Sequence, residues 1–151
     1  MFKKFAKSFL AVSMLFALSA PATVEASTNE EVMKTVLTEL EIKFMEEDGA
    51  LVLGTENGII VIKVDSKNDT INIAGISRLG ISQINRAKAY RIINKLNQDY
   101  AVKFYLDDDG DLISQVVFDT NDMTISKTAA AANLVRVVKG LEFAEEALKG
   151  L

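Results

Sequence analysis

Apolar and polar residues recur along the chain with periods that predict its elements. Between residues 29 and 40 the apolar residues stand at helical spacing, namely Val32, Met33, Val36, Leu37 and Leu40. Such spacing is typical of a helix with one apolar face. Thr28 and Glu31 are three residues apart at its start, where a hydroxyl and a carboxylate cap each other's free amides. The sequence therefore predicts a first helix that begins at Thr28.

The pattern changes between residues 42 and 76 to short β-branched runs separated by turn residues. The runs are IKFMEE, ALVLGTE, GIIVIKVD and TINIAGI, and the turns are Asp48-Gly49, Asn57-Gly58 and Lys67-Asn68-Asp69. Asparagine followed by glycine accepts the positive φ that a two-residue hairpin turn requires. We therefore expect an antiparallel meander over this segment.

Helical spacing returns at Ser82, with Ala89, Ile92, Ile93 and Leu96 on one stripe. Two alternating segments follow at residues 100–107 and 111–120, and Ser126 precedes a long apolar helix. The order is helix, strands, helix, two strands, helix. This order predicts an α+β fold in which helices flank an antiparallel sheet, without a βαβ crossover.

The first 26 residues have the pattern of a secretory signal peptide. Lys3, Lys4 and Lys7 precede an apolar run at residues 9–20, and small residues follow as far as Ala26. The run is about a dozen residues long, whereas roughly 20 are needed to span a bilayer. We expect cleavage near Ala26, which leaves a single domain at residues 27–151, periplasmic or secreted and without a stable membrane anchor.

Composition narrows the function of the remaining chain. Removal of residues 1–26 changes the formal charge from −4 to −6. An acidic balance argues against binding to nucleic acid, which needs a surplus of Lys and Arg. The chain contains no histidine and no cysteine. Because the usual nucleophile and base arrangements use those residues, we expect neither an enzyme nor a cofactor.

An acid-rich turn, Asp107-Asp108-Asp109-Gly110-Asp111, stands between the last two strands. Calcium loops place oxygen ligands around a glycine at their sixth position. With Gly110 in that position, Tyr105 and Val116 occupy the first and twelfth positions, which require an aspartate and a glutamate. The residues therefore favour a tight hairpin turn without a metal.

Two asparagines, Asn94 and Asn97, stand near the end of the second predicted helix. Asn97 has the residue type that ends a helix in the left-handed conformation. Asn94 is placed to bond the backbone of the adjoining strand. We expect both side chains to be structural.

Three cations recur at helical spacing on the same helix, Lys88, Arg91 and Lys95. They form either a docking face for an acidic partner or a solvated helix face. The spacing alone leaves both interpretations open.

The helix-to-hairpin junction resembles the YbjN domain family. Its pattern is a helix that ends in Asn, two residues and Asn, followed by a strand, an acidic turn with glycine and a returning strand. Asn94-Lys95-Leu96-Asn97 supplies the asparagines, although Leu96 stands where the family often has a larger aromatic residue. Residues 104–119 match the hairpin, with Asp109 and Gly110 in its turn. The resemblance covers roughly residues 28–148.

This resemblance implies a fold similar to that of type III secretion chaperones, an α+β sandwich that typically forms dimers. It also implies a chaperone-like or regulatory protein and brings no catalytic residues. The expected export departs from the cytoplasmic location of those chaperones.

The last helix has a wide apolar surface, formed by Ala130, Leu134, Val137, Val138, Leu141, Ala144 and Leu148. A helix of this kind is either enclosed in the core or held against another chain. We expect a homodimer that uses Leu134, Val137, Val138 and Leu141, and the alternative is a helix packed wholly within one chain.

The resulting hypothesis is an exported, non-enzymatic module that binds another protein or itself. A small-ligand or lipid carrier is the alternative, with Ile60, Ile62, Ile71 and Ile73 lining a pocket instead of a core. A third class, a metal-dependent hydrolase, requires a bound metal.

Overall fold

The computed structural model describes residues 28–56, 58–121 and 123–151. The predicted signal peptide and Asn57 of the predicted hairpin turn therefore lie outside the described residues.

Three helices are described, α2 (Asn29–Glu39), α3 (Arg86–Asp99) and α4 (Lys127–Leu148). The predicted capping box is present, because the Thr28 hydroxyl accepts the Glu31 N–H at 3.2 Å and the Glu31 carboxylate accepts the Thr28 N–H at 2.6 Å. The Ser126 hydroxyl caps α4 by accepting the Ala129 N–H at 3.1 Å. Both predicted helix starts are confirmed.

Six strands form one sheet in the order β1-β2-β3-β4-β6-β5, and every neighbouring pair is antiparallel. Their bounds are β1 Met45–Glu47, β2 Ala50–Gly54, β3 Gly58–Asp65, β4 Thr70–Ser77, β5 Lys103–Leu106 and β6 Leu112–Asp119. The predicted meander and the α+β fold class are confirmed.

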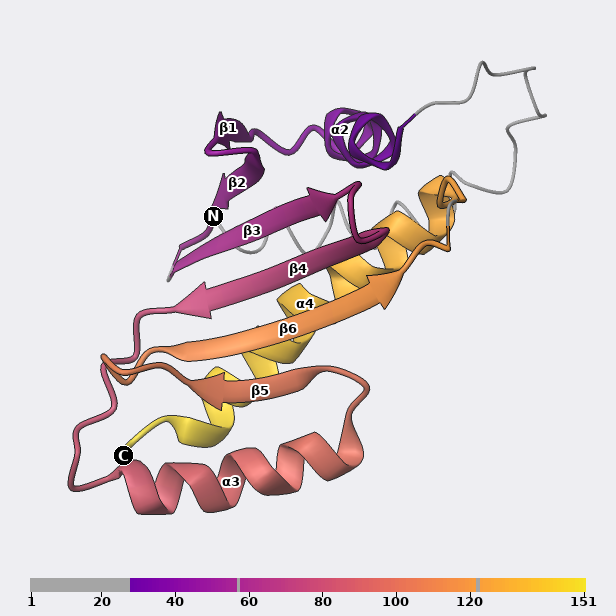
Figure 1. Ribbon diagram of the computed structural model, residues 1–151. Coiled ribbons are helices and arrows are strands. Elements are labelled where there is room, and N and C mark those ends of the chain that lie inside the picture. Colours follow the sequence, from indigo (N-terminus) through magenta and orange to yellow (C-terminus); the bar gives the residue numbers. More distant parts are fainter. Residues whose placement is uncertain (1–27, 57, 122) are drawn as a thin grey trace.

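All three helices lie on one side of the sheet (Figure 1). α4 crosses behind the middle of the sheet and packs on β4 and β6. α2 packs against α4 at the β1 edge, and α3 packs against β5 at the opposite edge. The other face of the sheet carries no helix in the described part of the chain.

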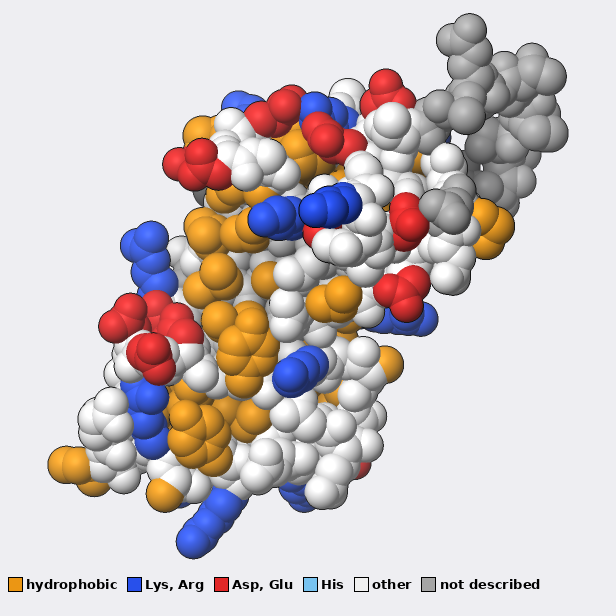
Figure 2. Space-filling model, viewed as in Figure 1, with side chains coloured by type: hydrophobic (Ala, Val, Ile, Leu, Met, Phe, Trp, Pro, Cys, Tyr) orange, Lys and Arg blue, Asp and Glu red, His pale blue; other side chains and the backbone are white. Residues whose placement is uncertain are grey.

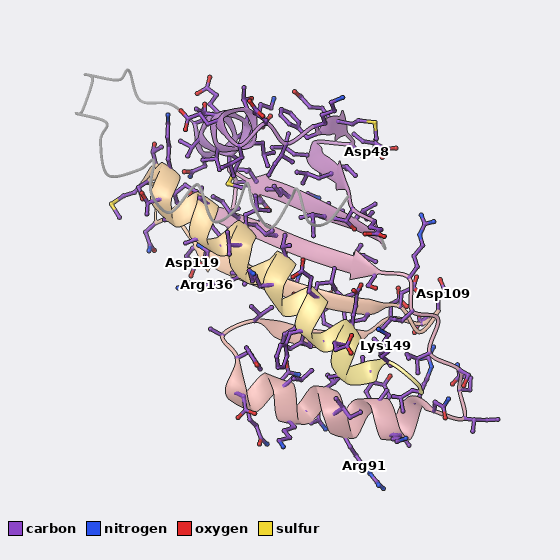
Figure 3. All side chains as sticks on the ribbon, turned by 180° about the vertical axis from the view of Figure 1, so that it is seen from behind. Asp48, Arg91, Asp109, Asp119, Arg136 and Lys149 are labelled. Carbon is purple, nitrogen blue, oxygen red and sulfur yellow. The ribbon has the colours of Figure 1, made fainter. Side chains whose placement is uncertain are left out.

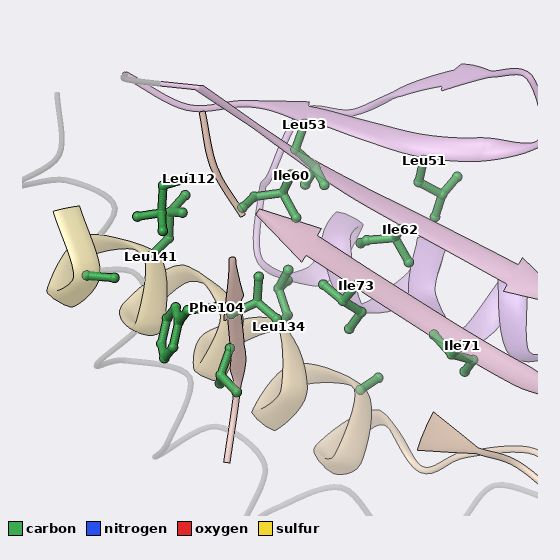
Figure 4. Packing of buried hydrophobic residues seen from close by; sticks show 14 of the residues in the cluster. Leu51, Leu53, Ile60, Ile62, Ile71, Ile73, Phe104, Leu112, Leu134 and Leu141 are labelled. Atoms are coloured by element: carbon green, nitrogen blue, oxygen red, sulfur yellow. The ribbon is translucent and has the colours of Figure 1, made fainter. Parts of the chain in front are cut away.

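The core lies between this helix layer and the sheet (Figure 4). Ile60, Ile62, Ile71 and Ile73 are at most 2% exposed and lie in one cluster with Leu134 of α4. Alternate strand residues point to this layer because side chains of a strand alternate between the two faces.

The second helix begins later than predicted, at Arg86 instead of Ser82. The Asn85 N–H donates to the Ser82 carbonyl at 2.9 Å, and the Arg86 N–H donates to the Gln83 carbonyl at 3.4 Å. These bonds span three residues, so residues 83–85 form a turn that precedes the helix.

Candidate protein-interaction surfaces

The acid-rich turn is held together by its own carboxylates. The Asp107 carboxylate accepts the backbone N–H of Asp109 at 3.0 Å and that of Asp111 at 2.9 Å. The Asp111 carboxylate accepts the Gly80 N–H at 3.1 Å and so links the turn to the segment before α3. The side chain of Asp107 thus stabilises the turn, and that of Asp111 stabilises the neighbouring loop, because both accept backbone N–H groups.

Gly110 is required by both conformation and space. Its φ is +85°, and a Cβ added there would lie 2.4 Å from the Ile81 carbonyl oxygen. The Ile81 N–H donates to the Gly110 carbonyl at 2.9 Å, so the two backbones are in direct contact. Only glycine fits this position without displacing the loop.

The other two acids of the turn, Asp108 and Asp109, are exposed. Within the described ranges, no group of three His, Cys, Asp or Glu side chains is placed to hold a metal ion. The expected hairpin turn between β5 and β6 is present.

Asn97 bonds the edge of the sheet, which corrects the roles predicted for the two asparagines. Its Nδ2 donates to the Phe104 carbonyl at 2.9 Å, and its Oδ1 accepts the Phe104 N–H at 2.7 Å. The helix continues to Asp99, so Asn97 does not end it, and Asn94 is exposed. The prediction assigned the strand contact to the wrong asparagine. Both asparagines lie within about one turn of the same helix, and the way α3 packs on β5 decides which of them reaches the strand.

The predicted dimer residues of the last helix are mostly in the core of a single chain. Leu134, Val137 and Leu141 are 1%, 0% and 6% exposed, and Val138 is partly buried. The sheet, α2 and α3 all contact α4, so its wide apolar surface is covered from several sides. The arrangement agrees with the alternative given above, a helix packed within one chain. These side chains therefore give no reason to expect a second chain.

The cations of α3 face solvent. Lys88, Arg91 and Lys95 are exposed, while Ala89, Ile93 and Leu96 of the same helix are buried. Figure 3 shows Arg91 pointing away from the sheet and the other helices. None of the three cations forms an ion pair with the part of the chain that the structure describes.

Charge is separated between the two edges of the sheet. Residues 28–56, at the α2 and β1 edge, contain eight carboxylates and two lysines. Lys34 there bonds Glu30 at 2.8 Å and Glu46 at 2.9 Å, and these side-chain bonds raise the pKa of Lys34. Residues 78–103, which include α3 at the opposite edge, contain six cations and one carboxylate. The four aspartates of the β5–β6 turn lie beside this segment, because Asp111 bonds the Gly80 N–H, so the excess of cations is local to the segment with α3.

The face of the sheet without helices is apolar over about half of its length, a feature that the sequence analysis missed. Figure 2 shows an apolar column that crosses the strands of this face. The residues that form it are Val52, Ile59, Val61, Ala74, Ile76, Tyr105 and Ile113, all partly exposed. We call these seven residues the apolar column. The sequence signal was available, since β3 and β4 carry apolar residues at both alternating positions.

Two surface clefts are bordered by charged residues. One of about 440 Å³ is lined by Ser77, Leu79 and charged residues, namely Glu56, Arg78, Glu142, Glu145, Glu146 and Lys149. The other, of about 130 Å³, lies beside the β1–β2 turn. Its lining is half acidic and half apolar, namely Glu30, Glu46, Glu47 and Asp48 together with Gly49, Ala50, Leu51, Ile62 and Val64. The four isoleucines proposed to line a carrier pocket belong to the core, and of them Ile62 also lines the smaller cleft. The larger cleft is lined mainly by charged residues, and the smaller one is below the roughly 300–1,000 Å³ of most ligand pockets, so neither favours a lipid carrier.

The fold is similar to that of YbjN and of type III secretion chaperones. The crystal structure of YbjN from E. coli has a TM-score of 0.63 and 16% identity, over 80% of this chain and 89% of that one. The HopA1–SchA chaperone–effector complex gives a TM-score of 0.54 and 12% identity, over 78% of this chain and 92% of that one.

The Yersinia pestis type III secretion chaperone SycH, in complex with a stable fragment of YscM2, gives a TM-score of 0.50 and 15% identity, over 80% of this chain and 98% of that one. The chain matches no protein-family model and no curated protein. At sequence identities this low, the similarity establishes a shared fold and nothing about function. The resemblance inferred from the helix-to-hairpin junction is thereby confirmed for the fold.

Proposed function

We propose that this protein is an exported, non-enzymatic interaction module that binds an acidic surface of another polypeptide through Lys88, Arg91 and Lys95. The main observation behind this proposal is that these three cations are exposed in one row on a helix at the edge of the molecule. Opposite charge on a partner steers association and fixes its orientation. The partner role is chaperone-like or regulatory, and folds of this kind occur in chaperone–effector complexes.

Export rests on the first 26 residues, whose lysines, short apolar run and small residues form a signal-peptide pattern. Within the described ranges, no helix has the length and apolar character to cross a bilayer. The proposed location is periplasmic or secreted.

The non-enzymatic part of the proposal rests on chemistry. A chain without histidine and cysteine lacks the residues that most often act as base or nucleophile. Asp107, Asp111 and Asn97 bond backbone groups and thereby serve the fold.

A charge-reversal experiment tests the partner surface. The triple variant Lys88→Glu, Arg91→Glu, Lys95→Glu is compared with wild type in affinity capture from the native host, followed by mass spectrometry. We expect a partner that wild type retains at low salt and the variant loses, because reversed charges repel an acidic surface.

The matched control reverses two lysines and one arginine elsewhere, Lys43→Glu, Lys67→Glu and Arg136→Glu, all exposed positions outside α3. The control has the same net charge as the variant and should keep the partner. If the variant and the control both lose the partner, the effect of the charges is nonspecific. If both retain the partner, this surface does not bind it.

Export is tested by the intact mass of the chain recovered outside the inner membrane of its host. The proposal expects a chain shortened by about 26 residues, as the signal pattern places the cleavage. A chain that begins at Met1 in the cytoplasm would overturn it.

A further inference from the structure

The open face of the sheet has an ordered pattern of residues. Strand register places Ile59, Ile76, Ile113 and Tyr105 side by side in one row across β3, β4, β6 and β5. The next row begins with Met45, Val52, Val61 and Ala74 and ends with Gln115 and Lys103. The third row contains Glu47, Ala50, Lys63, Asn72 and Val117. The face is thus apolar at one end of the strands and polar at the other.

The apolar column is not part of the core of this chain. None of its seven residues belongs to the buried cluster or to the partly buried residues that pack against it. The residues that alternate with them along the strands, such as Ile60 and Ile73, fill the helix-covered side instead. Apolar side chains that line a rigid sheet outside the core mark a surface that another element covers.

The size of the face suits a protein partner. Strands of three to eight residues at a spacing of about 4.8 Å give the sheet a plane of roughly 600 Å². Side chains roughen this plane and bring the contact area close to the ~800 Å² that each partner buries in a standard interface. The apolar end of the face borders on polar and charged residues, and an apolar area next to a polar rim is usual in interfaces.

We propose that a second copy of this chain covers the open face, so that two sheets pack face to face around a two-fold axis that runs along the strands between β3 and β4. This axis divides the six strands equally, with β1, β2 and β3 on one side and β4, β6 and β5 on the other. The rotation places β3 of one copy over β4 of the other. Packed sheets of this kind lie about 10 Å apart and within about 30° of parallel.

The register makes the face complementary to itself. Since Ile59 and Ile76 are cross-strand partners, the rotation places Ile59 of each copy over Ile76 of the other. Val61 in the same way faces Ala74 of the second copy. The largest apolar side chains of the central strands therefore meet each other in both halves of the interface, as an isologous contact requires.

Charges on the central strands also fit this arrangement. Lys63 faces Asn72 of the second copy, and Asp65 faces Thr70 of the second copy. Each charged residue of β3 thus meets an uncharged polar residue, which avoids the cost of opposing like charges. The helix layer and the α3 cations stay on the outer sides of the pair, so the self-association is independent of the function proposed above.

Single substitutions on the open face test the proposal. Ile76→Glu and Ile59→Lys are each compared with wild type by sedimentation, with circular dichroism to verify folding. Both side chains are partly exposed in one chain, so the fold tolerates the change. We expect wild type to dimerise and each variant to dimerise at least about 100-fold more weakly, because two unpaired charges become buried. The matched control is Ile84→Glu, since Ile84 is 93% exposed outside the sheet and should leave dimerisation unchanged.

A mixture of the two variants tests the register itself. In a mixed dimer, Lys at position 59 faces Glu at position 76, and the opposite contact keeps the wild-type Ile76 and Ile59. The mixture should therefore form dimers although neither variant does so alone. A mixture that stays monomeric overturns the proposed axis.

Three other results would overturn the proposal. A wild-type chain that stays monomeric at high micromolar concentration excludes self-association. A dimer that survives both face variants uses another surface. A dimer that Ile84→Glu disrupts equally does not depend on the open face.

Discussion

Replacing Asn97 with alanine should destabilise the protein by breaking a bridge between α3 and the sheet. The change removes the two bonds between the Asn97 amide and the Phe104 backbone, at 2.9 and 2.7 Å. A hydrogen bond contributes about 0.5–1.5 kcal/mol net, so the two together contribute about 2 kcal/mol. Water can reach this partly buried site, which keeps the loss below that of a fully buried pair.

The matched control is Asn94→Ala, one turn earlier in the same helix and exposed. Both changes raise helix propensity alike, so the difference between the variants isolates the bridge to Phe104. Urea unfolding followed by circular dichroism should give a difference of about 2 kcal/mol, and thermal unfolding a difference of about 8 °C. Variants that agree within about 0.5 kcal/mol would refute the reasoning, since exposed substitutions vary by that much.

Three further predictions concern the glycine of the turn, the core and acid stability. Gly110→Ala should lower the free energy of unfolding by more than about 2 kcal/mol, because φ is positive and the added Cβ meets the Ile81 carbonyl; an unchanged urea midpoint would contradict this. Val137→Glu should abolish the folded circular dichroism spectrum, since the side chain is 0% exposed and its carboxylate would be buried unpaired; a folded variant would place Val137 outside the core. Bonds from the side chain and backbone of Asn68 lower the pKa of Asp65 from its usual 3.8, so the carboxylate stabilises the fold above that pH and less as pH falls below it. The variant Asp65→Asn should therefore be less stable than wild type above pH 3.8, and the difference in free energy of unfolding between the two should shrink as the pH falls below that value. A difference that stays constant in urea titrations across this pH range would argue against the prediction.

Local signals predicted the elements well because their physics is local. Thr28 with Glu31 and Ser126 satisfy free amides within three residues of themselves, so the helix starts could be inferred from the sequence. The predicted alternation of residues 100–107 likewise agrees with the structure, in which Val102, Phe104 and Leu106 are buried. Each of these signals is complete within a few residues of sequence.

Features that depend on the placement of whole elements could not be predicted in this way. Asn97 bonds a strand seven residues away, and its partner is fixed by how α3 docks on β5. Val61 and Ile62 are both apolar, and the sequence does not state which face of the sheet the helices cover. Ile62 is buried in the core because its side chain points to the face that α4 covers, whereas Val61 points to the open face and is partly exposed.

The placement of α2 and α3 at opposite edges of the sheet gives the molecule an electric dipole. Residues 28–56 at one edge hold eight carboxylates and two lysines, and residues 78–103 at the other hold six cations and one carboxylate, with the four aspartates of the β5–β6 turn beside them. Charged ends of this kind orient a protein in the field of a charged surface. In dilute buffer, the chain therefore turns the exposed cations of α3 toward a polyanion and the α2 edge toward a polycation.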